Sequence, residues 1–250
     1  MEYQKIMVVI TSALFSDQQG GNVSLPSANR VARLQRSITS LSNFGLTNFV
    51  LLDNTLPNGF KTETILQGIT INLITPILIE PPIKFLPNEY QENGPSRLEA
   101  VLLYQARSAL FKMLQDFEYV LKISAGYQIR NLDEILSKTE NGVVYRMGNP
   151  FRKVIKFCLT SFYILPVQHF LDLSSHFYGQ INTMSNLKPL EYHLYTYIKS
   201  IQYQAIAINY PVLDADFLSS GRSSADLDYK LKELVFRLLA KLGVYAFQPK

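Results

Sequence analysis

The most constraining feature of this sequence is a helical stripe that lies between two short apolar runs. Residues 5–10 form a continuous run rich in branched side chains, which is typical of a strand buried on both faces. Apolar side chains then recur at helical spacing from Val31 to Phe44, and Gly45 provides a helix stop. Residues 48–52 form a second buried-strand run. Strand, helix and strand of these lengths predict a βαβ unit and hence a parallel sheet.

The same alternation continues along the chain. We expect further strands at residues 69–74, 119–123, 143–147, 156–165 and 205–213, of which 156–165 has an antiparallel, alternating pattern. We expect further helices at residues 98–113, 166–174, 191–199 and 226–242, and loops at residues 16–27 and 75–95. This order predicts an α/β fold with a doubly wound, mostly parallel sheet and an antiparallel elaboration in the C-terminal half. No repeat or linker divides residues 1–250, so one domain is expected.

Composition and charge exclude several classes of protein. Hydrophobic residues make up 47% of the chain and charged residues 18%, which predicts a sizeable core. No apolar run approaches the roughly 18 to 20 residues that span a bilayer, and the chain does not open with a signal-peptide pattern. The single cysteine, Cys158, has no disulfide partner, so we expect a soluble cytoplasmic protein. The net charge of +4 leaves peripheral contact with the inner membrane face open, but no nucleic-acid-binding motif is present.

Polar residues that follow the predicted strands are the candidates for ligand binding, because open α/β sheets bind ligands at the carboxyl ends of their strands. These residues are 11–27, 53–54, 124–130 and 214–222. No G-x-G-x-x-G and no P-loop motif occurs, so dinucleotide and P-loop nucleotide binding lose their usual support. Asp53 ends the second strand, where it could accept hydrogen bonds from a ribose or a base. A purely structural role as a turn former is an equally good interpretation.

Three segments in order carry a resemblance to a known family. The first helix contains Arg30, Gln35 and residues 37–41, the next strand ends in Asp53–Asn54, and a later strand continues into Lys122-Ile-Ser-Ala-Gly-Tyr127. This order resembles bacterial surface-polysaccharide glycosyltransferases of the A-type, Rossmann-like fold, over roughly the first 130 residues. The chain departs from that pattern at Ala125–Gly126, where the family has Gly-Arg, and Arg130 is the expected substitute for the missing arginine.

The resemblance implies a nucleotide-activated sugar as donor and a glycan or lipid-linked acceptor. It implies that residues 1–130 are the nucleotide-sugar-binding half and residues 131–250 the acceptor-side half. The implied donor-binding residues are Thr11, Arg30, Asp53, Asn54, Arg97, Lys122, Ser124, Tyr127 and Arg130. Lys122 would pair with a donor phosphate, and the alternative is a structural ion pair with an acid such as Glu118 or Asp133.

No cofactor is expected, and transfer is predicted to be independent of metal. Sugar transfer needs the charge on the departing phosphate to be stabilised, by a metal on a D-x-D pair or by basic side chains. The usual place of that pair, after the fourth strand, holds Ser124-Ala-Gly126. Asp214 and Asp216 form a literal D-x-D later in the chain, so a divalent metal there stays open as the less favoured alternative.

An inverting transferase also needs a group that takes the proton of the acceptor hydroxyl. The candidates are Glu191, His193, Asp214 and Asp216. Glu191 and His193 open a predicted helix, where an acid is favoured for structural reasons as well. The aromatic residues at 192, 195, 197 and 203 could stack on sugar faces or simply pack in the core.

Three functions are therefore in competition. The favoured one is a glycosyltransferase of cell-surface polysaccharide synthesis. The second is a sugar-phosphate nucleotidyltransferase, which lacks support because no Gly-rich loop with Arg and Lys follows the first strand. The third is a Rossmann-like binding domain without catalytic activity, which the missing D-x-D and the altered motif at residues 122–127 would permit.

Overall fold

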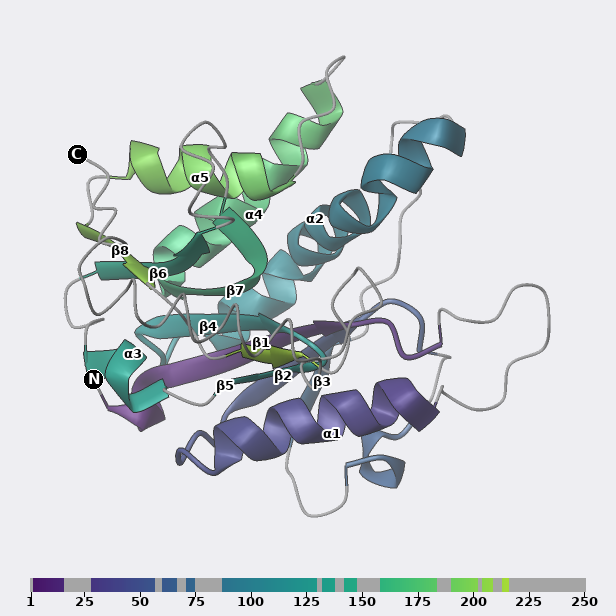
Figure 1. Ribbon diagram of the computed structural model, residues 1–250, viewed down its shortest axis with the longest axis vertical. Coiled ribbons are helices and arrows are strands. Elements are labelled where there is room, and N and C mark those ends of the chain that lie inside the picture. Colours follow the sequence, from purple (N-terminus) through teal and green to yellow (C-terminus); the bar gives the residue numbers. More distant parts are fainter. Residues whose placement is uncertain are drawn as a thin grey trace, which may run out of the picture.

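A computed structural model of the protein shows a seven-stranded sheet between two layers of helices (Figure 1). It describes residues 2–15, 28–56, 60–66, 71–74, 87–129, 132–137, 142–147, 158–183, 190–201, 204–208 and 213–215. The predicted loop at residues 16–27 and the predicted helix at residues 226–242 lie outside these ranges.

The main sheet has the strand order β3-β2-β1-β4-β7-β6-β8. Its strands are β1 (Ile6–Ser12), β2 (Phe49–Asp53), β3 (Asn72–Ile74), β4 (Tyr119–Ser124), β6 (Gly142–Met147), β7 (Cys158–Pro166) and β8 (Gln204–Ile208). Every pairing is parallel except those of β7, which is antiparallel to both β4 and β6. This confirms the predicted mostly parallel α/β sheet with an antiparallel strand in the C-terminal half. A second, two-stranded sheet joins β5 (Tyr127–Ile129) to β9 (Leu213–Ala215).

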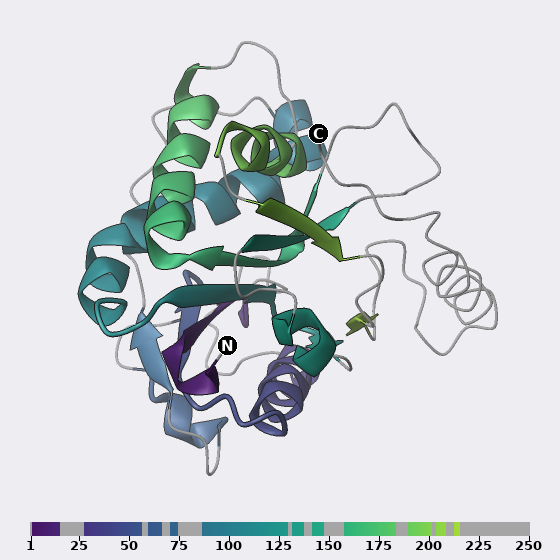
Figure 2. The same ribbon diagram turned by 90° about the vertical axis from the view of Figure 1, so that its left-hand side faces the viewer.

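Helices cover both faces of the main sheet. They are α1 (Ala28–Ser42), α2 (Pro87–Met113), α3 (Leu132–Ser137), α4 (Val167–Thr183) and α5 (Leu190–Ser200). Helices α1 and α3 pack on one face, which we call the α1 face, and α2, α4 and α5 pack on the other, which we call the α2 face (Figure 1). The view in Figure 2, turned by 90°, shows the same two layers on either side of the sheet.

The alternation of side chains along each strand builds two separate cores. Met7 and Val9 of β1 join the core of the α2 face, whereas Val8 and Ile10 join the core of the α1 face. Both faces of β1 and β2 are therefore buried, which explains why their sequences read as continuous apolar runs. Helix α1 buries its predicted apolar stripe, and Gly45 follows it with a φ of 87°, a conformation that glycine adopts without strain.

Some predicted elements were wrong in extent. Helix α2 begins at Pro87, inside the predicted loop at residues 75–95, because proline is well tolerated in the first turn of a helix. The predicted strand at residues 205–213 is divided between β8 and β9, which belong to different sheets. Strand β5 and helix α3 were not predicted, since elements this short carry no readable periodicity.

Candidate functional site

The carboxyl ends of β1 and β4 lie side by side at one edge of the sheet. Thr11 pairs with Ser124 in the parallel register, and the amide of Ala125 donates to the carbonyl of Thr11 at 2.9 Å. Thr11, Lys122 and Ser124 point to the α2 face, whereas Asp53 points to the α1 face, as strand alternation requires. The predicted donor residues therefore form two groups, on opposite faces of the sheet at the same edge.

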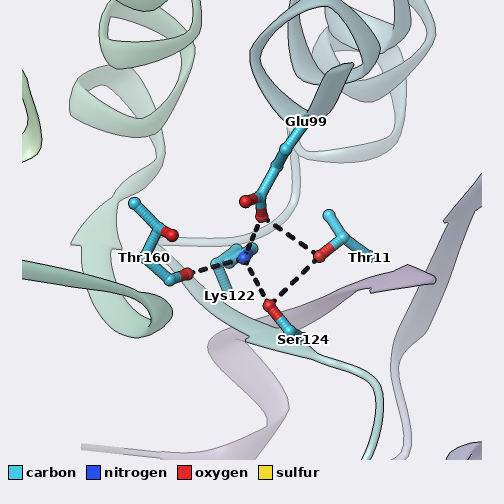
Figure 3. A network of polar contacts seen from close by, with 5 residues as sticks. All are labelled: Thr11, Glu99, Lys122, Ser124 and Thr160. Atoms are coloured by element: carbon cyan, nitrogen blue, oxygen red, sulfur yellow. Dashed lines mark hydrogen bonds and ion pairs between the residues drawn. The ribbon is translucent and has the colours of Figure 1, made fainter. Parts of the chain in front are cut away.

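A polar network around Lys122 forms the group on the α2 face (Figure 3). The side chain of Lys122 is 0% exposed, and its Nζ forms an ion pair with Oε1 of Glu99, a residue of α2 that is 17% exposed. Nζ also donates to Oγ of Ser124 at 2.9 Å and to the carbonyl of Thr160 at 2.6 Å. The hydroxyl of Thr11 donates to the same Oε1 of Glu99 at 3.2 Å. The charge of a fully buried lysine is thus neutralised inside the protein.

The acid that pairs with Lys122 is not one that sequence reasoning suggested. Glu118 forms an exposed ion pair with Lys5 at 2.6 Å, and Asp133 accepts a hydrogen bond from the Tyr3 hydroxyl. Glu99 was missed because it lies on a distant helix. A usable signal existed, since Glu99 is followed directly by the apolar run 100–103, all of which is buried. A charged residue that adjoins a buried helical face needs a partner in the core.

Two buried hydroxyls of β7 have no hydrogen-bond partner among the described residues. Tyr163 of β7 is opposite Lys122 in the antiparallel register, is 0% exposed, and has no partner for its hydroxyl. Nζ of Lys122 lies 5.8 Å from the centre of the Tyr163 ring. Burial, and secondly the negative charge of Glu99, hold the pKa of the Tyr163 hydroxyl well above its usual value. Ser161, two residues earlier on β7, also has a buried Oγ without a partner among these residues.

Glu191 is close enough to this network for the charges to interact. It lies in the first turn of α5, which packs against β7 and contacts α2. Burial is the main cause that raises the pKa of the Glu191 carboxyl, and the charge of Glu99 adds to it. A backbone hydrogen bond and the charge of Lys122 act in the opposite direction. The structure therefore brings one predicted proton acceptor to the same region as Thr11, Lys122 and Ser124.

His193 belongs to a different environment. It is 5% exposed and packs between α4 and α5, where its ring centre lies 6.4 Å from that of His176. Residues two apart on a helix point in different directions, so Glu191 and His193 do not share a face. Tyr195 and Tyr197 are buried in the same core, which makes them packing residues. Tyr203, the last of the predicted aromatic residues, lies outside the described part of the chain.

Asp53 leads the group on the α1 face and is 0% exposed. Its carboxylate accepts hydrogen bonds from the amide of Leu14 at 2.8 Å, from the amide and hydroxyl of Thr55 at 2.8 and 2.6 Å, and from the hydroxyl of Ser12. Ser12 is the last residue of β1, and the other donors belong to the segments that follow β1 and β2. Asp53 therefore joins the two loops at the sheet edge, with the half-buried Asn54 next to it.

Two arginines of α1 approach the same edge. Nη1 of Arg30 donates to the carbonyl of Ala13 at 2.8 Å. Arg33 packs over Gly126, where its Cδ would lie 3.5 Å from a Cβ built on that glycine. Gly126 has a φ of 101°, which disfavours any residue with a side chain at this position. Sequence reasoning missed Arg33, because it only became a candidate once its contact with Gly126 was visible.

The remaining predicted site residues are only partly described. Tyr127 is half-buried against the core of the α1 face, and its strand, β5, pairs with β9 so that Gln128 is opposite Asp214. The side chains of Asp214 and of Arg97, which lies on α2, are outside the described part of the structure, as are Arg130 and Asp216 entirely. Among the described side chains, no group of three or more His, Cys, Asp or Glu residues is arranged to hold a metal ion.

Comparison with known proteins extends only to the fold. No family model matches the sequence, and no curated protein matches it. A solved structure named as a glucose-1-phosphate thymidylyltransferase from Bacillus anthracis is similar, with a TM-score of 0.47, 9% identity, and coverage of 86% of this chain and 92% of the other. A 4-diphosphocytidyl-2C-methyl-D-erythritol synthase from Anaerococcus prevotii has a TM-score of 0.48 and 9% identity, with 95% and 100% coverage. A likeness this distant assigns no substrate or reaction to this chain.

The length and apolar character of the helices decide whether any of them could span a membrane. None of those in the described part of the chain combines the length and the apolar character needed to cross a bilayer.

Proposed function

We propose that this protein is a transferase whose substrate is a nucleotide-activated sugar, and that it moves the sugar to a glycan or lipid-linked acceptor in cell-surface polysaccharide synthesis. One observation carries the proposal. At the edge where β1 and β4 end together, Arg30 and Arg33 lie on the α1 face, and Glu99, paired with Lys122, lies on the α2 face. In open α/β sheets this edge is where ligands bind.

The α1 face and the α2 face differ in the part of a nucleotide-sugar that each could bind. On the α1 face, Arg30 and Arg33 bring positive charge to the edge, and arginine is well suited to binding phosphate. On the α2 face, the charge of Lys122 is neutralised by Glu99, so we assign the diphosphate to the arginines and not to Lys122. Positive charge beside the departing phosphate would stabilise the transition state of sugar transfer.

Glu191 is the proposed proton acceptor for the acceptor hydroxyl. A general base works best when its pKa is near the working pH, and the pKa of Glu191 is shifted upward, toward that range. Its position in the first turn of α5 puts it next to the carboxylate network. Asp214 stays a second candidate, because β9 brings its backbone to the strand that follows β4.

Nucleotidyl transfer is the alternative reaction of the same substrate class. It would use a nucleoside triphosphate, which carries more negative charge than a nucleotide-sugar. The chain has no Lys or Arg between Ser12 and Asn29, the segment that follows β1. Sugar transfer is therefore the favoured reaction. Identification of the reaction products tests directly whether nucleotidyl transfer occurs instead.

The test combines ligand binding with product analysis. The melting temperature is measured with UDP-glucose, UDP-N-acetylglucosamine, GDP-mannose and CMP-sialic acid, since a ligand that binds only the folded state raises it. We expect one of these donors to raise the melting temperature and to release its nucleotide when acceptor is supplied. Release of pyrophosphate from a nucleoside triphosphate and a sugar 1-phosphate would instead support nucleotidyl transfer. No shift with any donor or triphosphate would overturn both.

A pair of arginine variants tests the phosphate assignment. Arg33→Met should weaken nucleoside diphosphate binding by about tenfold, the effect of losing one charge-assisted contact. Arg36→Met, on the same helix at an exposed position, is the matched control and should leave the affinity within about twofold. Equal effects of the two substitutions would contradict the assignment.

A further inference from the structure

We propose that Glu99 is a substrate-binding residue: Lys122 anchors one oxygen of its carboxylate, and the other accepts a hydrogen bond from a hydroxyl group of the bound sugar, beside the unpartnered hydroxyl of Tyr163. This assignment rests on the proposed transferase function and adds to it the site that recognises the sugar.

The two oxygens of Glu99 differ in what they contact. Oε1 takes both the ion pair with Lys122 and the hydrogen bond from Thr11, as Figure 3 shows. Oε2 has no hydrogen-bond partner among the described residues (Figure 3). Lys122 is itself held by Ser124 and Thr160, so the carboxylate is fixed in orientation. Because the Glu99 side chain is 17% exposed, its second oxygen can be reached by a ligand at the sheet edge.

The buried hydroxyl of Tyr163 has no hydrogen-bond partner among the residues that the structure describes. A buried hydroxyl without a partner destabilises the fold, and such groups are rare in native proteins. Phenylalanine would fill nearly the same volume without that cost. The Oγ of Ser161, also on β7, is likewise buried without a partner among the described residues. A hydrogen bond to a ligand would explain why this position holds tyrosine, which packing alone does not explain.

The charges of the network indicate which part of the donor it binds. Among the described side chains of this network, Lys122 and Glu99 neutralise each other and Glu191 is acidic, so the network itself offers no net positive charge for a phosphate. Carboxylate and hydroxyl groups are instead suited to the neutral, polyhydroxylated sugar. Phosphates belong on the opposite face, with Arg30 and Arg33.

The experiment compares binding of a nucleotide-sugar with binding of its nucleoside diphosphate by calorimetry, using UDP-glucose with UDP and GDP-mannose with GDP. We expect Glu99→Gln to lower the affinity for the nucleotide-sugar by about tenfold to hundredfold, the range for a hydrogen bond to a charged group, while the diphosphate affinity stays within about twofold. Glu118→Gln is the matched control, because Glu118 also pairs with a lysine, Lys5, but before the first residue of β4, at the opposite end of that strand. It should change neither affinity.

Two further variants keep the test valid if Glu99→Gln fails to fold. Lys122→Met combined with Glu99→Gln removes both charges and should fold, with the same selective loss of sugar affinity. Tyr163→Phe should leave the melting temperature unchanged or raise it and still weaken binding of the nucleotide-sugar. Unchanged sugar affinity in folded variants, or equal loss for the nucleotide-sugar and the diphosphate, would overturn the role of Glu99. If the wild-type protein binds no nucleotide at all, the proposed function falls and this site with it.

Discussion

Two carboxylates at one edge of the sheet, the buried Asp53 and the partly exposed Glu99, differ in how their oxygens are used. Asp53 accepts hydrogen bonds from the last residue of β1 and from the loops after β1 and β2, whereas Glu99 keeps one oxygen without a described partner. A carboxylate whose oxygens are all hydrogen-bonded within the protein holds the backbone, whereas a carboxylate with an unbonded oxygen can bind a ligand. At the residue scale, this distinction leads to two predictions about stability.

Asp53→Ala should destabilise the protein by about 2–4 kcal/mol, because it leaves several buried donors without an acceptor. The donors include the backbone amides of Leu14 and Thr55, which cannot turn toward solvent without moving the loops. Urea unfolding of the variant measures the change. Asn54→Ala is the control and should shift the free energy of unfolding by less than about 0.5 kcal/mol. A stability of Asp53→Ala equal to that of the wild type would show that the carboxylate does not hold the loops.

The ion pair between Lys122 and Glu99 should be non-additive in a double-mutant cycle. Lys122→Met alone leaves a mostly buried carboxylate without its partner and should cost about 2–4 kcal/mol, discounted for the partial exposure of Glu99. The double variant Lys122→Met with Glu99→Gln should recover much of that loss. Chemical denaturation of the two single variants and the double variant gives the coupling free energy. A coupling near zero would mean that the pair does not form in solution.

At the scale of elements, the interface between α4 and α5 introduces a dependence on pH. His176 of α4 faces His193 and Tyr197 of α5, with ring centres 6.4 and 5.5 Å away, and its Nε2 is buried without a described partner. Burial lowers the pKa of His176 below its usual value of 6.5. The unfolded chain therefore takes up the proton first as the pH falls.

The free energy of unfolding should therefore decrease as the pH falls from about 6.5 toward the lowered pKa of folded His176. His176→Phe keeps an aromatic ring at the interface and should remove this part of the pH dependence. Melting temperatures of the wild type and the variant between about pH 7.5 and 5 give the difference, in which other titrating groups such as Glu191 cancel. Identical pH profiles would show that the imidazole is not desolvated at this interface.

At the scale of the whole molecule, the split of the edge into a basic and a carboxylate side predicts how transfer responds to metal removal. In the proposed sugar transfer, the place of a D-x-D pair after β4 is taken by Ser124-Ala-Gly126, and Arg30 and Arg33 of α1 would supply the positive charge instead. We expect activity to keep most of its value after dialysis against EDTA. A complete loss that Mg²⁺ or Mn²⁺ restores, and that Asp214→Asn reproduces, would instead assign the metal to the late D-x-D.

Local sequence by itself determined the order of the helices and strands in the first half of the protein and the antiparallel nature of β7, but not where α2 begins. These depend on the spacing of apolar residues along the chain, which is a local property. It also indicated that Lys122, as a charge at the end of a buried strand, needs a partner.

Only the tertiary structure decided which partner that is, because Glu99 reaches Lys122 through the packing of α2 on the sheet. In the same way, strand register sends Asp53 and Lys122 to opposite faces, and the meeting of β5 with β9 separates β9 from β8. Contacts between residues far apart in sequence depend on how helices and strands pack in the folded protein. The local spacing of residues does not encode this packing.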